Sequence, residues 1–211
     1  MESAADLGYR GAIRVMTKGA GEMSEREKMR SGEAFDGRDP EIIALRDRGQ
    51  TLLRELNHYK AGDSRHQEIC AELFEQFGPN SILSTPFCCE FGSNIRIGTH
   101  SYINFNVTML DVGPIVIGDN VMIAPNVQLY TATHDEEAQL RRSWAVYGKA
   151  ITIGDDVWIG GGAIICPGVT IGPRSIIGAG AVVTRDIPAD SVALGNPARV
   201  VRQVNTPSST V

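Results

Sequence analysis

The sequence lacks the features that mark several common classes of protein. No cluster of lysine and arginine occurs in the chain, whose formal net charge is −5, so nucleic-acid binding is not expected. No apolar run approaches the roughly 20 residues that span a bilayer, and no charged and apolar leader opens the chain. We therefore expect a cytoplasmic protein without a membrane partner.

Cysteines and aromatic residues are also few. Cys70, Cys88, Cys89 and Cys166 show no paired spacing, and the adjacent Cys88 and Cys89 are poor candidates for a disulfide. Reduced thiols are the expected state, as is usual in the cytosol. Aromatic residues make up 6% of the 211 residues and hydrophobic residues 42%, a composition that suits a core of stacked aliphatic side chains.

What the chain does contain is a repeat of six residues, from Ile97 to about Leu194. Each unit opens with an aliphatic residue and carries a small or β-branched residue at its fifth position. A period of six does not fit a helix of 3.6 residues per turn, but it equals three alternations of a strand, so both positions share one face. Gly, Asn, Asp and Pro crowd the positions between, where the chain must turn.

The repeat predicts a parallel β-helix, in which strands and corners form coils stacked about 4.8 Å apart. The alternative, coincidental Ile-Gly pairs in ordinary loops, requires all of these units to stay in phase by chance. The rule lapses after His134, yet Leu129 and Ile153 remain a multiple of six apart. Residues 135–150 are therefore predicted to form a loop ejected from the coil, where binding residues tend to lie.

Helices are predicted before the repeat. Asp39 is a capping residue followed by Pro at the first turn, and Ser64-x-x-Gln67 has the form of a capping box. The three predicted helices run from Met23 to about Arg30, from Asp39-Pro40 to Gly62, and from Ser64 to Gly78-Pro79.

The chain is thus predicted to consist of an α-helical cap and an all-β main domain, flanked by two tails. Residues 1–22 form a disordered extension, 23–79 the helical cap, 80–202 the β-helix with its ejected loop, and 203–211 a disordered tail.

A group of motifs stands together between Met23 and Arg202. The most specific are Thr131-Ala132-Thr133-His134 and Gly195-Asn196-Pro197-Ala198-Arg199, combined with the helical cap. In this combination the chain resembles the maltose and galactoside O-acetyltransferases, which are hexapeptide-repeat acyltransferases. The resemblance implies a left-handed parallel β-helix, a homotrimer with active sites between subunits, acetyl-CoA as co-substrate, and acetylation of a hydroxyl of a sugar or similar small polyol.

Acetyl transfer from a thioester to a hydroxyl needs a base, and imidazole suits this task because its pKa lies near neutrality. By resemblance, His134 is the general base. The family usually has Pro where Asp135 follows it, Glu at Val146 and Pro at Ala150. What orients the ring is left open, with Glu136, Glu137 and the backbone as candidates. The other histidines, His58, His66 and His100, are interpreted as structural or solvent-facing.

Asn104 matches a residue that lies beside the reacting acetyl group in the family. Its amide donates either to the acceptor or to the developing oxyanion; the alternative is an asparagine ladder along one corner. A backbone N–H near Gly161 is where the family supplies an oxyanion donor. The positions that match the acceptor pocket, each of which is alternatively a plain surface residue, are Asp36, Arg46, Glu90, Tyr102 and Asp111.

Coenzyme A needs an extended groove for pantetheine and cations for its phosphates. Trp158 is predicted to wall the site. The resemblance assigns Gly161, Ala179 and Thr184 to the groove, and Arg185, Arg199 and Arg202 to the phosphates. No P-loop or GxGxxG motif is present.

Three other functions compete with this prediction. One is N- or O-acetylation of an amino sugar or a non-sugar metabolite. Another is a metal-dependent hydratase, which needs three His ligands, whereas the repeats hold only His100 and His134, so no metal is expected. The third is a non-catalytic β-helix scaffold. The sequence does not name the physiological acceptor.

Overall fold

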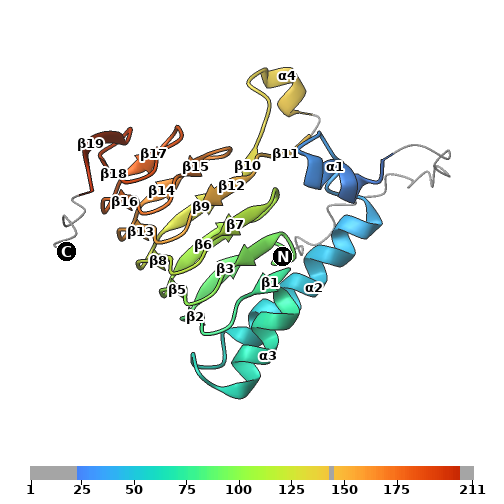
Figure 1. Ribbon diagram of the computed structural model, residues 1–211. Coiled ribbons are helices and arrows are strands. Elements are labelled where there is room, and N and C mark those ends of the chain that lie inside the picture. The colour runs from blue at the N-terminus through green and yellow to red at the C-terminus, as the bar shows by residue number, and fades with distance from the viewer. Residues whose placement is uncertain (1–22, 143–144, 205–211) are drawn as a thin grey trace, which may run out of the picture.

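The computed structural model describes residues 23–142 and 145–204. The predicted extension over residues 1–22, and residues 205–211 of the predicted tail, lie outside these ranges. The described chain is a parallel β-solenoid with helices at its N-terminal end (Figure 1). The all-β main domain and the helical cap are therefore confirmed.

Three parallel sheets form the walls of the solenoid. The first wall consists of β1 (Gln76–Phe77), β4 (Ile95–Ile97), β7 (Ile115–Ile117), β12 (Ile151–Ile153) and β15 (Thr170–Ile171). The second consists of β2 (Ile82–Leu83), β5 (Tyr102–Ile103), β8 (Met122–Ile123), β13 (Trp158–Ile159), β16 (Ile176–Ile177), β18 (Ser191–Leu194) and the antiparallel β19 (Arg199–Gln203). The third consists of β3 (Phe87–Cys89), β6 (Val107–Leu110), β9 (Gln128–Tyr130), β14 (Ile164–Ile165) and β17 (Val182–Val183).

The coils stack in register, so that equivalent positions of the repeat lie above one another. Ile97 pairs with Ile117, Ile117 with Ile153, and Ile153 with Ile171. All four side chains are buried, whereas the residue before each of them faces outward. The apolar first position of the repeat therefore fills the core, as the period of six predicts.

The ejected segment leaves the frame intact. Ile153 and Ile171 are eighteen residues apart, one coil of three hexapeptides, while Ile117 and Ile153 are thirty-six apart. The additional residues form an antiparallel hairpin of β10 (Ala132–Thr133) and β11 (Tyr147–Gly148), with α4 (Ala138–Arg141) between them. The predicted loop is thus a hairpin that starts three residues earlier than expected, at Ala132, and projects beyond the coils (Figure 1).

The second and third helices of the cap end earlier than predicted, whereas the first ends close to the predicted residue. α1 (Glu25–Ser31) begins with a capping box between Ser24 and Glu27. α2 (Pro40–Leu56) is capped by Asp39, as predicted, but ends well before Gly62. Asn57 ends it because its side chain donates to the Phe87 carbonyl oxygen and accepts from the Phe87 N–H, both at 2.9 Å.

α3 (Ser64–Leu73) corrects two further predictions. Its N-cap is Asp63, and Ser64 is its first helical residue, so the predicted capping box is wrong. The helix ends at Leu73 because the backbone turns to pair with the first wall: the N–H of Glu75 donates to the carbonyl oxygen of Ile95 at 3.0 Å. The first strand, β1, therefore falls inside the range predicted as helical.

A second, smaller core joins the cap to the coils. It consists of Met29, Phe35, Ile42, Phe91 and Val112, all buried. α1 also packs against β11 of the hairpin. The cap, the first coils and the hairpin are thus held together by one apolar cluster.

All four cysteines lie in the described residues and are free thiols. Within residues 23–142 and 145–204, no helix combines the length and the apolar character that crossing a membrane requires.

The close stacking of the coils gives a test of the fold. Gly160→Ala is expected to destabilise the protein by roughly 2–4 kcal/mol, because a Cβ there would lie 2.5 Å from the backbone nitrogen of Ala179 on the next coil. Gly161→Ala is the matched control, since its Cβ would meet the Pro125 carbonyl oxygen at 3.3 Å, a contact that a small shift relieves. Thermal unfolding of the two variants measures the difference, and equal melting temperatures would contradict the stacking.

Candidate functional site

His134 stands directly after β10, at the base of the hairpin. Its ring is exposed, and its Nδ1 lies 3.0 Å from the carbonyl oxygen of Ala145, just before β11. Because a carbonyl oxygen only accepts, this bond places a proton on Nδ1 and leaves the Nε2 lone pair free. Of the three candidates left open by the sequence, the backbone therefore orients the ring, rather than Glu136 or Glu137.

Asp135 follows His134, and its carboxylate bonds to the opposite strand of the hairpin. One of its carboxylate oxygens accepts from the Tyr147 hydroxyl at 3.1 Å, across the base of the hairpin. This bond raises the pKa of the Tyr147 hydroxyl, because it favours the protonated phenol beside a carboxylate. Asp135 thus ties the two strands of the hairpin together.

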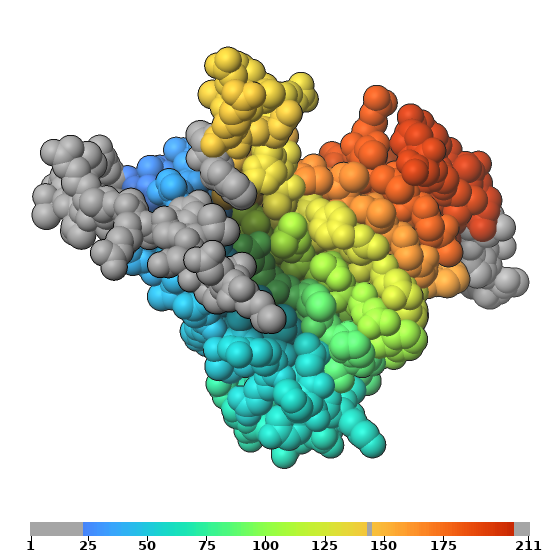
Figure 2. Space-filling view, turned by 180° about the vertical axis from the view of Figure 1, so that it is seen from behind, coloured from blue at the N-terminus to red at the C-terminus, as the bar shows by residue number. Residues whose placement is uncertain are grey.

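His134 opens onto a cavity of about 510 Å³ between the hairpin, the cap and the first coils. Three of the predicted acceptor residues, Asp36, Arg46 and Glu90, line this cavity with it. Figure 2 shows the hairpin (yellow) standing out from the coils beside the cap (blue). The structure therefore brings four predicted site residues from three different elements into one pocket.

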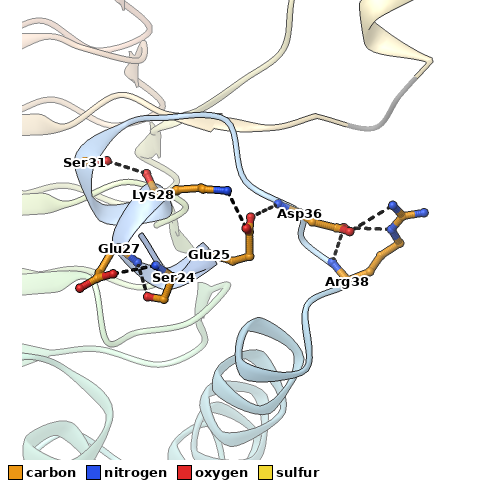
Figure 3. Close-up of polar contacts among 7 residues, drawn as sticks. All are labelled: Ser24, Glu25, Glu27, Lys28, Ser31, Asp36 and Arg38. Atoms are coloured by element: carbon orange, nitrogen blue, oxygen red, sulfur yellow. Dashed lines mark hydrogen bonds and ion pairs between the residues drawn. The ribbon is translucent and has the colours of Figure 1, made fainter. Parts of the chain in front are cut away.

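The Asp36 carboxylate is held by Arg38, two residues further along the chain. Its carboxylate accepts from the Arg38 backbone N–H at 3.0 Å and, in a bidentate pair, from the Arg38 guanidinium at 2.9 and 3.1 Å (Figure 3). The side-chain hydrogen bond from Arg38 holds the pKa of this carboxyl below its usual range. Glu25 fixes the same segment, accepting from the Asp36 N–H at 2.7 Å and from Lys28 at 2.8 Å.

The second carboxylate of the pocket is also paired. Glu90 accepts from Nε of Arg46 at 3.0 Å. The guanidinium of Arg46 also donates to the Gly37 carbonyl oxygen at 3.3 Å and lies 5.2 Å from the centre of the Phe91 ring. Gln50 donates to the Glu90 carbonyl oxygen at 2.9 Å. The charged part of the lining therefore consists of two ion pairs, each of one carboxylate and one guanidinium.

The prediction that Asp111 contacts the acceptor is wrong. Its side chain is fully buried. One carboxylate oxygen accepts from the N–H groups of Glu90 and Phe91, both at 2.9 Å, and the other from Asn94 at 3.4 Å. Asp111 therefore fixes the turn that carries Glu90. The next residue, Val112, lines the pocket in its place.

A different set of predicted residues gathers at another edge of the solenoid. Asn104, Gly161 and Ala179 lie at the corner between the second and third walls, on successive coils that also include Ala124-Pro125. Oδ1 of Asn104 accepts from the Phe105 N–H at 2.9 Å, which leaves the two protons of its amide nitrogen as donors. None of these residues lines the pocket of His134.

Tyr102 and Trp158 belong to the face beside this corner. The outward positions of the second wall stack in register and are largely apolar: Ile82, Tyr102, Met122, Trp158 and Ile176. The first four of them are exposed, Met122 to 61% and Trp158 to 53%. We call this row of five side chains the apolar ladder. It is a continuous exposed apolar strip, which is typical of an interaction surface.

The predicted phosphate-binding residues lie towards the C-terminal end. Thr184 and Arg185 are exposed just after β17, and Arg199 and Arg202 are exposed on β19. Within the described ranges no carboxylate forms an ion pair with any of these three arginines.

The remaining histidines stand apart from the pocket. His66 is fully buried in α3, His58 is exposed with Nδ1 2.6 Å from the Arg54 carbonyl oxygen, and His100 is exposed at a corner. Among the residues that the structure describes, no group of three or more His, Cys, Asp or Glu side chains is placed to hold a metal ion.

The pocket also contains residues that sequence reasoning missed. Arg38 lines it and pairs with Asp36. Ala145, which supplies the carbonyl oxygen that holds His134, was missed as well, although it is not part of the lining. A run of apolar residues completes the lining: Phe35, Leu110, Val112, Ala132 and Val146. Ala132 and Val146 belong to segments that the sequence had already singled out, but Phe35, Leu110 and Val112 look like ordinary core residues there, and only the packing of the hairpin against the cap brings all five together.

Two family models match the chain. Residues 28–78 match the "maltose acetyltransferase hexapeptide capping motif", and residues 150–185 match the "bacterial transferase hexapeptide (six repeats)". The galactoside O-acetyltransferase of Escherichia coli (strain K12) is 42% identical over 180 residues, which cover 85% of this chain and 89% of that protein.

Solved structures agree with these matches. A hexapeptide-repeat acetyltransferase from Vibrio cholerae O1 biovar eltor, complexed with acetyl coenzyme A, is 47% identical with a TM-score of 0.82, over 87% of this chain and all of that one. A galactoside acetyltransferase in complex with coenzyme A is 42% identical with a TM-score of 0.83, over 87% of this chain and 92% of that one.

Asp111→Asn tests the buried carboxyl. Burial raises the pKa of Asp111 to about 7, whereas the carboxyl of an unfolded chain ionises near pH 4. The wild type's free energy of unfolding should therefore fall, relative to that of the variant, as pH rises from about 4 to about 7, by at most on the order of 4 kcal/mol. Urea titrations at several pH values measure this difference in free energy of unfolding. A difference that does not change with pH would contradict the raised pKa of Asp111.

Proposed function

Since the chain belongs to the family of the maltose and galactoside O-acetyltransferases, and is thus an acetyl-CoA-dependent acetyltransferase, we propose that it acetylates a hydroxyl of a sugar or similar small polyol. In this proposal His134 is the general base, and the active site lies between two subunits of a homotrimer. The free thiols and the acetyl-CoA requirement suit a cytoplasmic enzyme.

The observation that carries the proposal is the fixed tautomer of His134. Its Nδ1–H is bound to the Ala145 carbonyl oxygen, so Nε2 is the ring nitrogen left to act, and the exposed ring lines the pocket. An imidazole held in this way is ready to accept the proton of a hydroxyl as that hydroxyl attacks. The two ion pairs that also line the pocket offer acceptors and donors for further hydroxyl groups.

The chemistry divides between His134 and the corner that carries Asn104. Nε2 of His134 takes the proton while the acceptor oxygen attacks the thioester carbon. The amide of Asn104 and the N–H of Gly161 donate to the oxygen that gains negative charge. Within the described chain the N–H of Gly161 has no hydrogen-bond partner, so it is available for this role, whereas the N–H groups of Gly160 and Gly162 donate to neighbouring coils. When the carbon–sulfur bond breaks, the imidazolium returns its proton to the leaving thiolate, giving an acetyl ester and free coenzyme A.

A second copy of the chain is needed to bring these halves together. In one chain, His134 opens at the hairpin, while Asn104 and Gly161 lie at a different corner and outside its pocket. The apolar ladder runs beside the second corner and supplies a surface that a neighbouring copy would cover. Three copies related by a cyclic axis would each contribute both halves, one to each neighbour.

We further propose that coenzyme A follows the corner of small residues away from Asn104. Gly161 and Ala179 leave room for the pantetheine arm, beside Trp158. Thr184 and the three exposed arginines, Arg185, Arg199 and Arg202, would then meet the phosphates.

His134→Ala is expected to lower kcat by roughly 10²–10⁴-fold, because the general base is lost. Coenzyme A binding, measured by calorimetry, should be unchanged. His58→Ala is the matched control, since His58 is also exposed but lies outside the pocket, and its activity should equal that of the wild type. Release of free thiol from acetyl-CoA with a panel of sugars measures the rates. Full activity of His134→Ala would show that the base is misassigned.

Mixed oligomers test whether two chains share a site. His134→Ala and Asn104→Ala should each be nearly inactive alone. If His134 and Asn104 come from neighbouring chains, random mixing of the two variants by co-expression leaves about a quarter of the sites with both groups intact. Activity should return to about that level. If both groups belonged to the same chain, every mixed site would lack one of them, and no activity would return.

A further inference from the structure

The hairpin that orients His134 is short. Its strands β10 and β11 pair over only two residues each, and the pair next to the base is Thr133 with Tyr147. A two-stranded ribbon of this length is marginally stable by itself. The side-chain contacts that close the hairpin therefore decide how firmly the Ala145 carbonyl oxygen is held against Nδ1 of His134.

One hydrogen bond between side chains crosses the hairpin beside this contact. The Tyr147 hydroxyl donates to a carboxylate oxygen of Asp135 at 3.1 Å. Asp135 follows His134 directly, and Tyr147 lies two residues after Ala145. Within the described part of the hairpin, this is the one hydrogen bond between two side chains that links the outgoing strand to the returning strand. It therefore joins the neighbour of the base to the strand that orients the base.

The bond is protected from solvent and from deprotonation. Asp135 and Tyr147 are both half-buried, so water competes less for the bond than it would at an exposed site. The carboxylate favours the protonated phenol and raises the pKa of the Tyr147 hydroxyl above its ordinary value near 10. The hydroxyl therefore remains a donor over the neutral range in which an imidazole base works.

The carboxylate of Asp135 is itself held in place by the turn that follows it. The Glu137 N–H lies 3.4 Å from one of its oxygens, and the other oxygen accepts from Tyr147. The guanidinium of Arg141, at the end of α4, donates to the carbonyl oxygens of Asp135 at 2.9 Å and of Glu136 at 2.6 Å. The acceptor side of the bond is thus fixed from both its backbone and its side chain.

The other contacts of the returning strand do not replace this bond. The Val146 carbonyl oxygen accepts from the Phe35 N–H at 3.4 Å, which ties the strand to the cap. The Lys149 N–H donates to the Thr131 carbonyl oxygen at 2.9 Å, but Thr131 lies three residues before His134, at the foot of the hairpin. Neither contact reaches the part of the outgoing strand that follows the base.

We propose that Asp135 and Tyr147 are positioning residues for the acetyl transfer: their hydrogen bond holds the Ala145 carbonyl oxygen against Nδ1 of His134 and so keeps Nε2 as the basic nitrogen. Neither residue reacts. Without the bond, the returning strand shifts relative to the imidazole, and only a fraction of the molecules keeps the competent tautomer and orientation. The inference rests on the proposed function, because it assigns a task to two further residues beside the same base.

Tyr147→Phe is the informative variant, because it removes one oxygen and keeps the ring. Its kcat for thiol release should fall about threefold to tenfold, the effect of one hydrogen bond on the population of the competent state. KM for acetyl-CoA and the calorimetric affinity for coenzyme A should not change, which also shows that the variant is folded. Tyr130→Phe is the matched control, since its hydroxyl bonds to Gln128 on the same strand and outside the pocket, and its kcat should equal that of the wild type.

Two variants at Asp135 separate hydrogen bonding from charge. Asp135→Asn keeps an oxygen that accepts from Tyr147 and should retain at least about half of the wild-type kcat, whereas Asp135→Ala should fall as far as Tyr147→Phe. The double variant Asp135→Ala/Tyr147→Phe should fall no further than either single variant, because the same bond is lost. Losses that multiply, or an Asp135→Asn variant as slow as Asp135→Ala, would overturn the inference.

The tautomer of His134 gives a readout that does not depend on turnover. Nitrogen-15 NMR distinguishes a protonated from an unprotonated ring nitrogen, and His134→Ala identifies the signals of this ring. At a pH where the ring is neutral, the wild type should show Nδ1 protonated, and Tyr147→Phe a mixture of both tautomers. An unchanged spectrum in Tyr147→Phe overturns the inference even if kcat falls. Full activity of His134→Ala overturns the proposed function instead, and the spectrum then still decides whether the bond holds the ring.

Discussion

In-register stacking of the coils is the constraint on which the rest of the structure depends. Each strand is only two to five residues long and is held by backbone hydrogen bonds to the coils above and below. Such short strands have no stability of their own and exist only as part of the ladder. Because the ladder keeps its register over all coils, equivalent positions of the repeat form straight columns. Residues far apart in the sequence, such as Asn104 and Gly161, therefore share one edge.

The site combines this rigid lattice with one irregular insertion. The hairpin leaves the third wall after β9 and re-enters the first wall in frame at β12, so the insertion does not disturb the columns on either side. At its base, the hairpin meets the cap through the bridge of Phe35 and Val146. Three parts of the chain thus converge on His134: the lattice fixes its backbone, the returning strand fixes its ring, and the cap closes the pocket.

The sequence predicted well those features that repeat, and less well those that depend on a single contact. The period of six is local, so the walls and the preserved frame between Ile117 and Ile153 follow from it directly. The end of α2 was missed because it depends on Asn57 reaching the backbone of Phe87, thirty residues away. Asp111 was misassigned because a carboxylate in a turn looks the same whether it faces solvent or the N–H groups of a neighbouring coil. Of the pocket, Asp36, Arg46 and Glu90 were predicted through the family resemblance, whereas Arg38 and the apolar residues Phe35, Leu110 and Val112 became visible only through packing.

The hydrogen bond between His134 and the Ala145 carbonyl oxygen has a consequence for how this protein can diversify. A carbonyl oxygen is present whatever side chain its residue carries. Substitutions at 145 and 146 can therefore alter selectivity for the acceptor while the hydrogen bond to the His134 imidazole is kept. The side chains at 145 and 146 can change during evolution, whereas the carbonyl oxygen of residue 145, which orients the imidazole, is kept. Both belong to the same hairpin.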